Sequence, residues 1–178
     1  MQQGFRHWFL EQLAMYAAYH RDRRNRLTHH IGVPLIVFSL LLALTQVQVM
    51  RIEDFPLTGA AIVLGLLLLG YIAAVPLIGV LTAIFYGAVY SLVMKIAGDA
   101  PQAVWTVAGA GFVVGWIFQF VGHAFEGRRP ALTVNALQAF MAPPFLIAEM
   151  LFAAGFEKDL EASLQKRAVK YLPDQNAT

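Results

Sequence analysis

Long apolar runs separated by short polar segments dominate the chain. Residues 31–50 form the first run, which "RIEDFP" ends. Residues 57–94 form a much longer run with Pro76 near its middle, which predicts two helices joined by a tight turn or kink. Because about 20 helical residues cross the ~30 Å hydrocarbon core of a bilayer, the pattern predicts four membrane spans. These spans are expected over 25–50, 57–75, 76–96 and 102–126.

A last apolar run, residues 131–156, is interrupted by polar residues and prolines. It contains Asn135, Gln138, Pro143, Pro144 and Glu149. Each half is too short to cross a bilayer, so we expect a re-entrant or interfacial helical hairpin bent at "APP".

Amphipathic helices are expected at both ends of the chain. Residues 5–22 place Phe5, Trp8 and Leu13 at helical spacing, which predicts a helix lying on the membrane surface or on the protein. Asn25 follows "RDRR" and is expected to cap the next helix. Residues 157–171 have the pattern of a charged amphipathic helix. The expected fold is therefore an all-α, polytopic membrane helix bundle forming a single domain, 1–178.

The composition supports a membrane protein. Hydrophobic residues make up 58% of the chain and charged residues only 13%, whereas a soluble domain has about half and a quarter. The net charge of +2 is too small to indicate nucleic-acid binding. The absence of cysteine excludes disulfides and thiolate chemistry.

The basic residues predict an orientation. With four spans, 11 of the 13 Lys and Arg residues fall on one side and only Arg51 and Lys95 on the other. Cytoplasmic loops carry an excess of Lys and Arg, so we expect both termini in the cytoplasm and loops 51–56 and 97–102 outside. We expect the chain to be an integral membrane protein located in the bacterial inner membrane.

Two polar clusters are predicted to face each other at the cytoplasmic border. The first comprises His20, Asn25, His29 and His30, and the second comprises Gln119, His123, Glu126, Arg128 and Arg129. An even number of spans returns the second cluster to the side of the first. His123 and Glu126, three residues apart, share a helix face.

Converging imidazoles suit Zn, Cu, Fe or Ni. We therefore predict a metal site of His20, His29 and His123, with Glu126 as the next candidate ligand. The alternative is that these histidines are interfacial side chains hydrogen-bonded to the backbone or to lipid headgroups. The arginines either set the orientation or bind an anionic headgroup or fatty acid carboxylate. Glu149 needs a partner within its apolar surroundings and is a structural acceptor, a group that orients a ligand, or a ligand.

Three ordered motifs resemble those of a known family. They are "YHRDRRNRLTHHIGVP", "QFVGHAFEGRRPAL" and "APPFLIAEMLF". The family is that of the iron(II)-dependent 2-hydroxy fatty acid dioxygenases, known from the fungal endoplasmic reticulum and from bacteria. The resemblance covers roughly residues 5–155. Its motif positions are His20, Asn25, His29, Gly122, His123, Glu126, Pro130 and Glu149; His30 lies outside them.

The resemblance implies fatty acid α-oxidation, in which a 2-hydroxy fatty acid and O₂ give CO₂ and a fatty acid one carbon shorter. It implies Fe(2+) at the histidines, with the acyl chain between the spans, beside membrane lipid. We assign substrate binding to Arg128, Arg129, Asn25 and His30, and support of the ligands to Glu149 and Gln119. Two other functions stay open: another metal-dependent lipid hydroxylase, and a non-enzymatic lipid-binding or transport protein.

Overall fold

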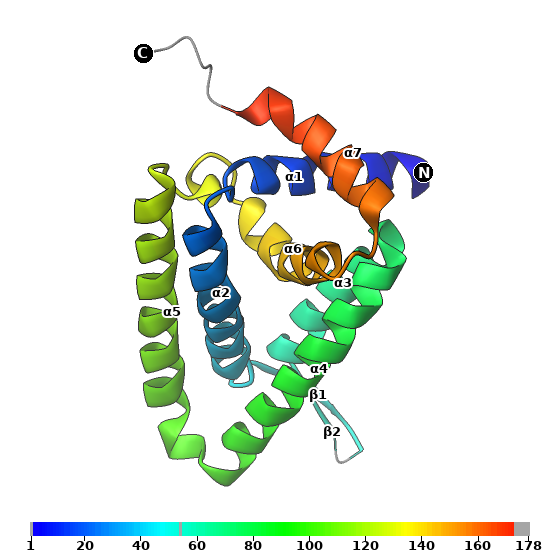
Figure 1. The fold of residues 1–178 in the computed structure, drawn as a ribbon. Coiled ribbons are helices and arrows are strands. Elements are labelled where there is room, and N and C mark those ends of the chain that lie inside the picture. The colour runs from blue at the N-terminus through cyan, green and yellow to red at the C-terminus, as the bar shows by residue number, and fades with distance from the viewer. Residues whose placement is uncertain (1, 54, 173–178) are drawn as a thin grey trace. The chain divides into compact units, whose positions relative to one another are not determined.

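The computed structural model describes residues 2–53 and 55–172, and these are mostly helical (Figure 1). Seven helices follow one another: α1 (Gln2–Ala18), α2 (Arg23–Leu44), α3 (Gly59–Ala74), α4 (Pro76–Asp99), α5 (Val104–Glu126), α6 (Gln138–Ala153) and α7 (Lys158–Ala168). Short 3₁₀ turns cover Pro101–Ala103, Ala131–Thr133 and Val169–Tyr171. The contacts divide the chain into two compact units. Unit 1 comprises Met1–His30 and Gln119–Thr178, and unit 2 comprises Ile31–Phe118.

Three of the described helical segments are long and apolar enough to cross a membrane. They are α2, α4 and Pro101–Glu126, which is α5 with the 3₁₀ turn before it. α3 is apolar but has 16 residues, which at 1.5 Å per residue is about 24 Å. The predicted class, an all-α membrane helix bundle with about four spans, is thus confirmed.

In unit 2, α3 and α4 form a tight helical hairpin, as the position of Pro76 predicted. Val75 ends α3, and its N–H donates to the carbonyl of Tyr71 over 2.9 Å. Pro76 begins α4, where its missing N–H costs no helical bond. At Gly79 a β-carbon would collide with the backbone of Tyr71 and Ile72. The helices therefore turn back on each other at a position that only glycine fits.

A β-hairpin precedes α3 and was not predicted. Strand β1 (Gln48–Ile52) pairs antiparallel with β2 (Phe55–Thr58). Glu53 in the turn has a φ of 54°, the left-handed value that two-residue hairpin turns require. Thr58 ends β2 and caps α3, because its hydroxyl accepts from Ala61 N over 3.3 Å. The segment "RIEDFP", predicted to be a loop, therefore belongs partly to the two strands.

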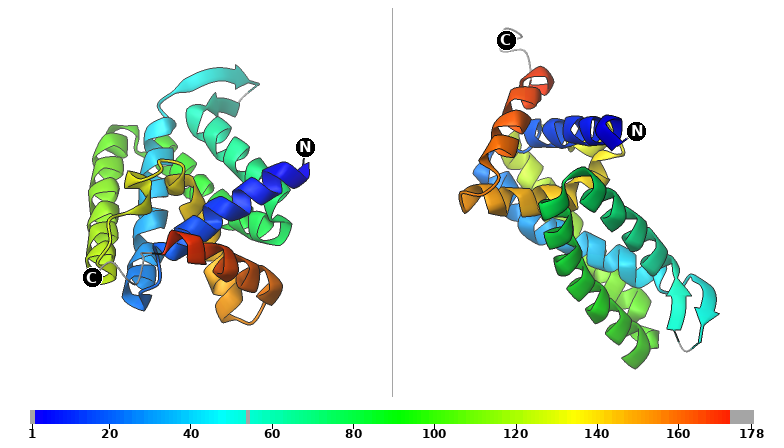
Figure 2. Two further views of the ribbon diagram at one scale, coloured as in Figure 1. Left: turned by 90° about the horizontal axis from the view of Figure 1, so that it is seen from above. Right: turned by 90° about the vertical axis from the view of Figure 1, so that its right-hand side faces the viewer.

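In unit 1, α1 lies against α6 and α7 (Figure 2). The second half of α1 is buried, including Phe9, Leu13 and Tyr16, whereas its first residues are exposed. Tyr16 packs on Phe145 of α6, with ring centroids 4.9 Å apart. The predicted N-terminal helix is present. It buries Leu13 on the protein, whereas Phe5 and Trp8 of the predicted apolar face are exposed.

The structure differs from the predicted hairpin in residues 131–156. Pro143 and Pro144 lie inside one continuous helix, α6. Two prolines remove two backbone hydrogen bonds and normally kink or break a helix. Here the segment Met141–Leu146 is wholly buried, so packing outweighs the local preference of the prolines. The expected bend at "APP" is wrong for this reason.

Candidate metal centre

Three buried histidines from separate segments of unit 1 converge. His20 lies in the link between α1 and α2, His29 on the second turn of α2, and His123 near the end of α5. Their ring centroids are 4.6 to 5.1 Å apart. One ring nitrogen from each lies within 4.8 Å of the others. The structure thus brings together the three histidines predicted as ligands.

Hydrogen bonds fix the tautomers of His20 and His29. Nδ1 of His20 lies 2.7 Å from the carbonyl oxygen of Tyr16, and Nδ1 of His29 lies 2.9 Å from that of Asn25. A carbonyl oxygen only accepts, so both Nδ1 atoms carry the hydrogen. In the neutral rings both Nε2 atoms then present lone pairs, and they face each other over 3.2 Å. A cation shared by the two Nε2 atoms would relieve this contact.

The third histidine offers a further unpaired atom. Nδ1 of His123 is buried and has no hydrogen-bond partner among the described residues. Nε2 of Gln119, four residues earlier on the same face of α5, is also buried without a partner, but as an N–H donor it would serve a bound water or ligand and not a cation. Buried polar atoms are rarely left without partners unless a water, ion or ligand serves them. The donor set thus fits a metal ion held by three neutral imidazoles.

The ring of His20 is firmly held. It stacks on Tyr16 with centroids 3.9 Å apart and planes only 10° from parallel. Burial lowers the pKa of His20 well below its usual value, and the neighbouring His29 adds to this effect. The ring is therefore neutral at physiological pH, which is the form that binds metals.

Glu126 is not among the converging ligand atoms. Its carboxylate accepts from the backbone N–H groups of Arg21 at 3.0 Å and Asp22 at 2.8 Å. It also accepts from Nδ2 of Asn25 at 3.0 Å. These donors lie in and just before the first turn of α2, so Glu126 anchors the start of that helix to the end of α5. This position suits a residue that orients His20 and His29.

Asp22 caps α2, and the prediction of Asn25 as the cap is wrong. The Asp22 carboxylate accepts from Arg24 N over 2.7 Å, and its carbonyl accepts from Arg26 N over 3.1 Å. Asn25 is fully buried one turn inside the helix. Its side chain donates to Glu126, and its backbone carbonyl accepts from His29. Asn25 therefore links the Glu126 carboxylate to His29 of the cluster.

Gly122 lets α5 approach α2 beside the histidines. A β-carbon there would lie 2.5 Å from Oδ1 of Asn25 and 3.1 Å from Nδ1 of His29, and would collide with Oγ1 of Thr28. Small residues allow such close helix contacts in membrane proteins.

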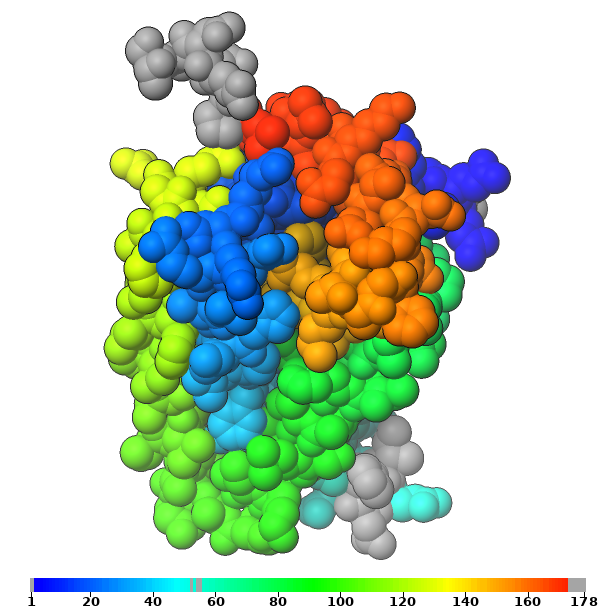
Figure 3. Space-filling model, in the orientation of Figure 1, coloured from blue at the N-terminus to red at the C-terminus, as the bar shows by residue number. Residues whose placement is uncertain are grey.

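A cavity of about 410 Å³ in unit 1 is bordered by His20. Its polar lining comprises Arg21, Arg26, Glu149, Glu161 and Gln165. Its apolar lining includes Phe145, Phe152 and Leu164. The surface is visibly hollowed between the first turns of α2 and the residues of α6 and α7 (Figure 3). This cavity is the space beside the histidines in which a ligand could bind.

Glu149 and His30 each interact with Arg26, which lines this cavity. The Glu149 carboxylate is 10% exposed and pairs with Nη1 of Arg26 over 3.2 Å. Nδ1 of His30 lies 2.8 Å from the carbonyl of Arg26, to which it donates. Neither residue is among the converging ligand atoms.

Arg128 and Arg129, predicted to bind substrate, differ in their surroundings. Nη1 of Arg128 donates to the carbonyl of Ala18 over 2.8 Å, and the guanidinium lies 3.9 Å from the centre of the Tyr19 ring. Arg129 is exposed. Neither lines the cavity.

The roles of Tyr16 and Asp22, and the cavity itself, were not foreseen. A weak signal existed for Asp22, since aspartate is as good an N-cap as asparagine and stands just before the helix. Tyr16 precedes His20 by four residues, the spacing of a stacked pair on a helix end.

Comparisons with known proteins agree with the resemblance. Residues 7–154 match the sequence model of the family described as "2-hydroxy-palmitic acid dioxygenase Mpo1-like". The chain is 36% identical over 158 residues to "2-hydroxy-palmitic acid dioxygenase MPO1" of Saccharomyces cerevisiae, covering 86% of each chain. No solved structure matches it.

Proposed function

This chain belongs to the Mpo1-like family of 2-hydroxy-palmitic acid dioxygenases, and we propose that it is an iron(II)-dependent enzyme that shortens 2-hydroxy fatty acids by one carbon. The observation that carries the proposal is the pair of Nε2 lone pairs of His20 and His29, facing each other over 3.2 Å. Two ligands at about 2.1 Å from one ion are separated by roughly this distance.

His20, His29 and His123 would hold Fe(2+), with their other ring atoms fixed by the surrounding protein. With three protein ligands, the ion would have room for a substrate and for O₂. The iron would supply O₂ activation and orientation of the hydroxy acid.

The reaction balances without a further cofactor. R-CH(OH)-COOH and O₂ give R-COOH, CO₂ and H₂O. The C1–C2 bond breaks, C1 leaves as CO₂, and C2 becomes the new carboxyl carbon. The substrate loses four electrons, which one O₂ accepts in full. Neither 2-oxoglutarate nor a flavin or nicotinamide is required.

The residues of the chain provide a preformed site for this chemistry. Tyr16 and Asn25 hold the Nδ1 hydrogens of His20 and His29, so both Nε2 atoms stay free. Glu126 fixes the start of α2, which carries His29. All three rings are buried within the protein.

The site is proposed to lie at the cytoplasmic border of the membrane. His20 and His29 lie near the N-terminal end of α2 and His123 lies near the C-terminal end of α5, next to most of the arginines. The apolar helices would accommodate the acyl chain while the headgroup reaches the histidines. This arrangement favours a substrate delivered from the membrane.

The test is metal content and product formation by the purified protein. Iron-loaded enzyme given 2-hydroxypalmitate under air should release CO₂ and form the C15 acid, and under argon it should form neither. Substitution of His20, His29 or His123 by Ala should remove bound iron and turnover together. A 2,3-dihydroxy product without chain shortening would instead identify a hydroxylase.

His7→Ala is the matched control. His7 is exposed on α1 and is not part of the cluster. This variant should keep full iron content and turnover. Full iron occupancy in all three cluster variants would contradict the proposed site.

A further inference from the structure

We propose that Arg26 binds the carboxylate of the substrate at the edge of the cavity beside the histidines. This inference rests on the proposed function, because it adds a substrate-binding residue to the same site.

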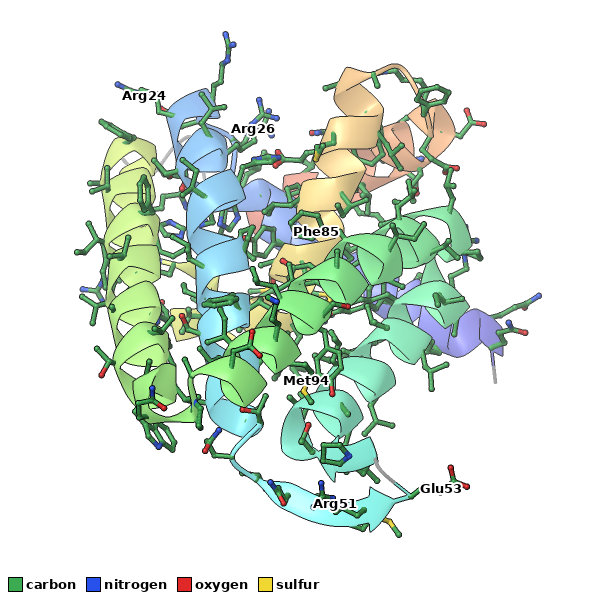
Figure 4. The ribbon with its side chains drawn as sticks, turned by 90° about the horizontal axis from the view of Figure 1, so that it is seen from below. Arg24, Arg26, Arg51, Glu53, Phe85 and Met94 are labelled. Atoms are coloured by element: carbon green, nitrogen blue, oxygen red, sulfur yellow. The ribbon has the colours of Figure 1, made fainter. Side chains whose placement is uncertain are left out.

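Arg26 is placed where a ligand can meet it. It lines the same cavity as His20. Its side chain is 43% exposed, whereas that of Glu149, which holds it, is 10% exposed. Figure 4 labels Arg24 and Arg26 at the start of α2. A cation that is held on one side by a buried carboxylate and is otherwise accessible is suited to receive a second carboxylate.

Arg26 has donors left for a ligand. Among the described residues, its guanidinium makes one hydrogen bond, from Nη1 to Oε1 of Glu149. A guanidinium carries five N–H donors in a planar fork. Donors other than the one used by Glu149 can therefore bind a carboxylate through two parallel hydrogen bonds.

Arg21 also lines the cavity but is exposed, whereas two other arginines near the histidines are already committed to other partners. Arg24 binds its neighbour Asp22 through Nε at 3.2 Å and Nη2 at 2.8 Å. Arg128 donates to the carbonyls of Ala18 and Tyr171. Neither lines the cavity.

The spacing along α2 fits a 2-hydroxy acid. Arg26 precedes His29 by three residues, so both lie on one face of the helix, about 4.5 Å apart along its axis. The hydroxyl and the carboxylate of the substrate are on adjacent carbons. A carboxylate held by Arg26 therefore leaves the hydroxyl close to the histidine cluster.

Glu149 does not oppose this arrangement. Burial raises the pKa of Glu149 to about 7, although Arg26 acts in the opposite direction. Near neutral pH its carboxyl group readily takes up a proton. A substrate carboxylate can then enter beside Arg26 without two full negative charges meeting.

The experiment compares binding of 2-hydroxyhexadecanoic acid and its methyl ester to the iron-loaded protein under argon, where no turnover occurs. The wild type should bind the acid about tenfold more tightly than the ester. Arg26→Gln should bind the acid about tenfold more weakly and the ester unchanged. Arg26→Lys should bind the acid with an affinity between those of the wild type and Arg26→Gln, because Lys keeps the charge but not the planar fork.

Arg23→Gln is the matched control, because Arg23 is exposed on the same helix turn and does not line the cavity. It should keep the preference for the acid. Unchanged ester binding and iron content in Arg26→Gln show that the variant is folded.

An Arg26→Gln protein that keeps the preference for the acid would overturn the role of Arg26. If the wild type still forms the C15 acid in air, the proposed function survives that result. Conversely, loss of the preference for the acid in Arg26→Gln supports the role of Arg26. If the wild type then forms no chain-shortened product, only the proposed function is overturned.

Discussion

The side chain of Asn25 donates a hydrogen bond to the Glu126 carboxylate over 3.0 Å, across 101 positions of sequence. The same carboxylate accepts backbone N–H groups just before α2. This contact joins the two helices that carry His29 and His123. A residue that orients metal ligands in this way typically changes metal affinity 10- to 100-fold when it is replaced.

We therefore predict that Glu126→Gln weakens iron binding about tenfold without removing a ligand. The Gln amide group would place an N–H donor against the N–H groups that Glu126 now accepts from. This would weaken the contact between the end of α5 and the start of α2. Metal titration measures the affinity, and the absorption spectrum of the Co(2+)-substituted protein reports the ligand set. The spectrum should be unchanged.

Glu157→Gln is the control, since Glu157 is exposed and lies before α7. It should leave the affinity unchanged. A Co(2+) spectrum that changes in Glu126→Gln would show that Glu126 is itself a ligand.

Gly122→Ala should destabilise the protein and weaken metal binding. The added β-carbon collides with Thr28 and lies 3.1 Å from Nδ1 of His29. Overpacking of this kind costs about 1–3 kcal/mol. Thermal unfolding and metal titration measure the two effects.

Gly109→Ala, in the same helix, is the control. A β-carbon at Gly109 meets nothing within 4 Å, and alanine favours a helix by roughly 0.5–1 kcal/mol over glycine. The control should therefore be neutral or stabilising. Equal behaviour of the two variants would contradict the close packing at Gly122.

Much of the fold follows from local sequence patterns, and the deviations have physical causes. Apolar runs and Pro76 predict the helices because length and proline geometry act locally. The continuous α6 could not be predicted, since burial of Pro143 and Pro144 depends on distant residues. The histidines were predictable from their types and positions. The role of Glu126 was not, because its partners lie more than 100 positions away.

The docking of α7 on α1 should depend on pH through Glu11. Lys170 above all, together with Arg167 and Tyr171, lowers the pKa of Glu11 to about 2. The carboxylate has a lower pKa in the folded protein than in the unfolded chain, so its contribution is complete above about pH 4.5. It is lost as the pH falls toward 2.

We expect α7 to become more susceptible to an acid-active protease as the pH falls through this window. Because 54% of the Lys170 side chain is accessible, solvent screening keeps the effect small. Glu11→Gln should show increased cleavage at all pH values, without this step. A pH step that persists in Glu11→Gln would assign the effect to another group.

The predicted orientation can be tested in intact cells with an impermeant thiol reagent, because the chain contains no native cysteine. Single cysteines replace Glu53, in the turn of the β-hairpin, and Asp159, which is exposed on α7. Eleven Lys and Arg residues against two predict that the Asp159 side faces the cytoplasm. The reagent should therefore label Glu53→Cys from outside, and Asp159→Cys only after the membrane is opened. Labelling of Asp159→Cys from outside intact cells would reverse the orientation and place the histidine cluster on the outer face.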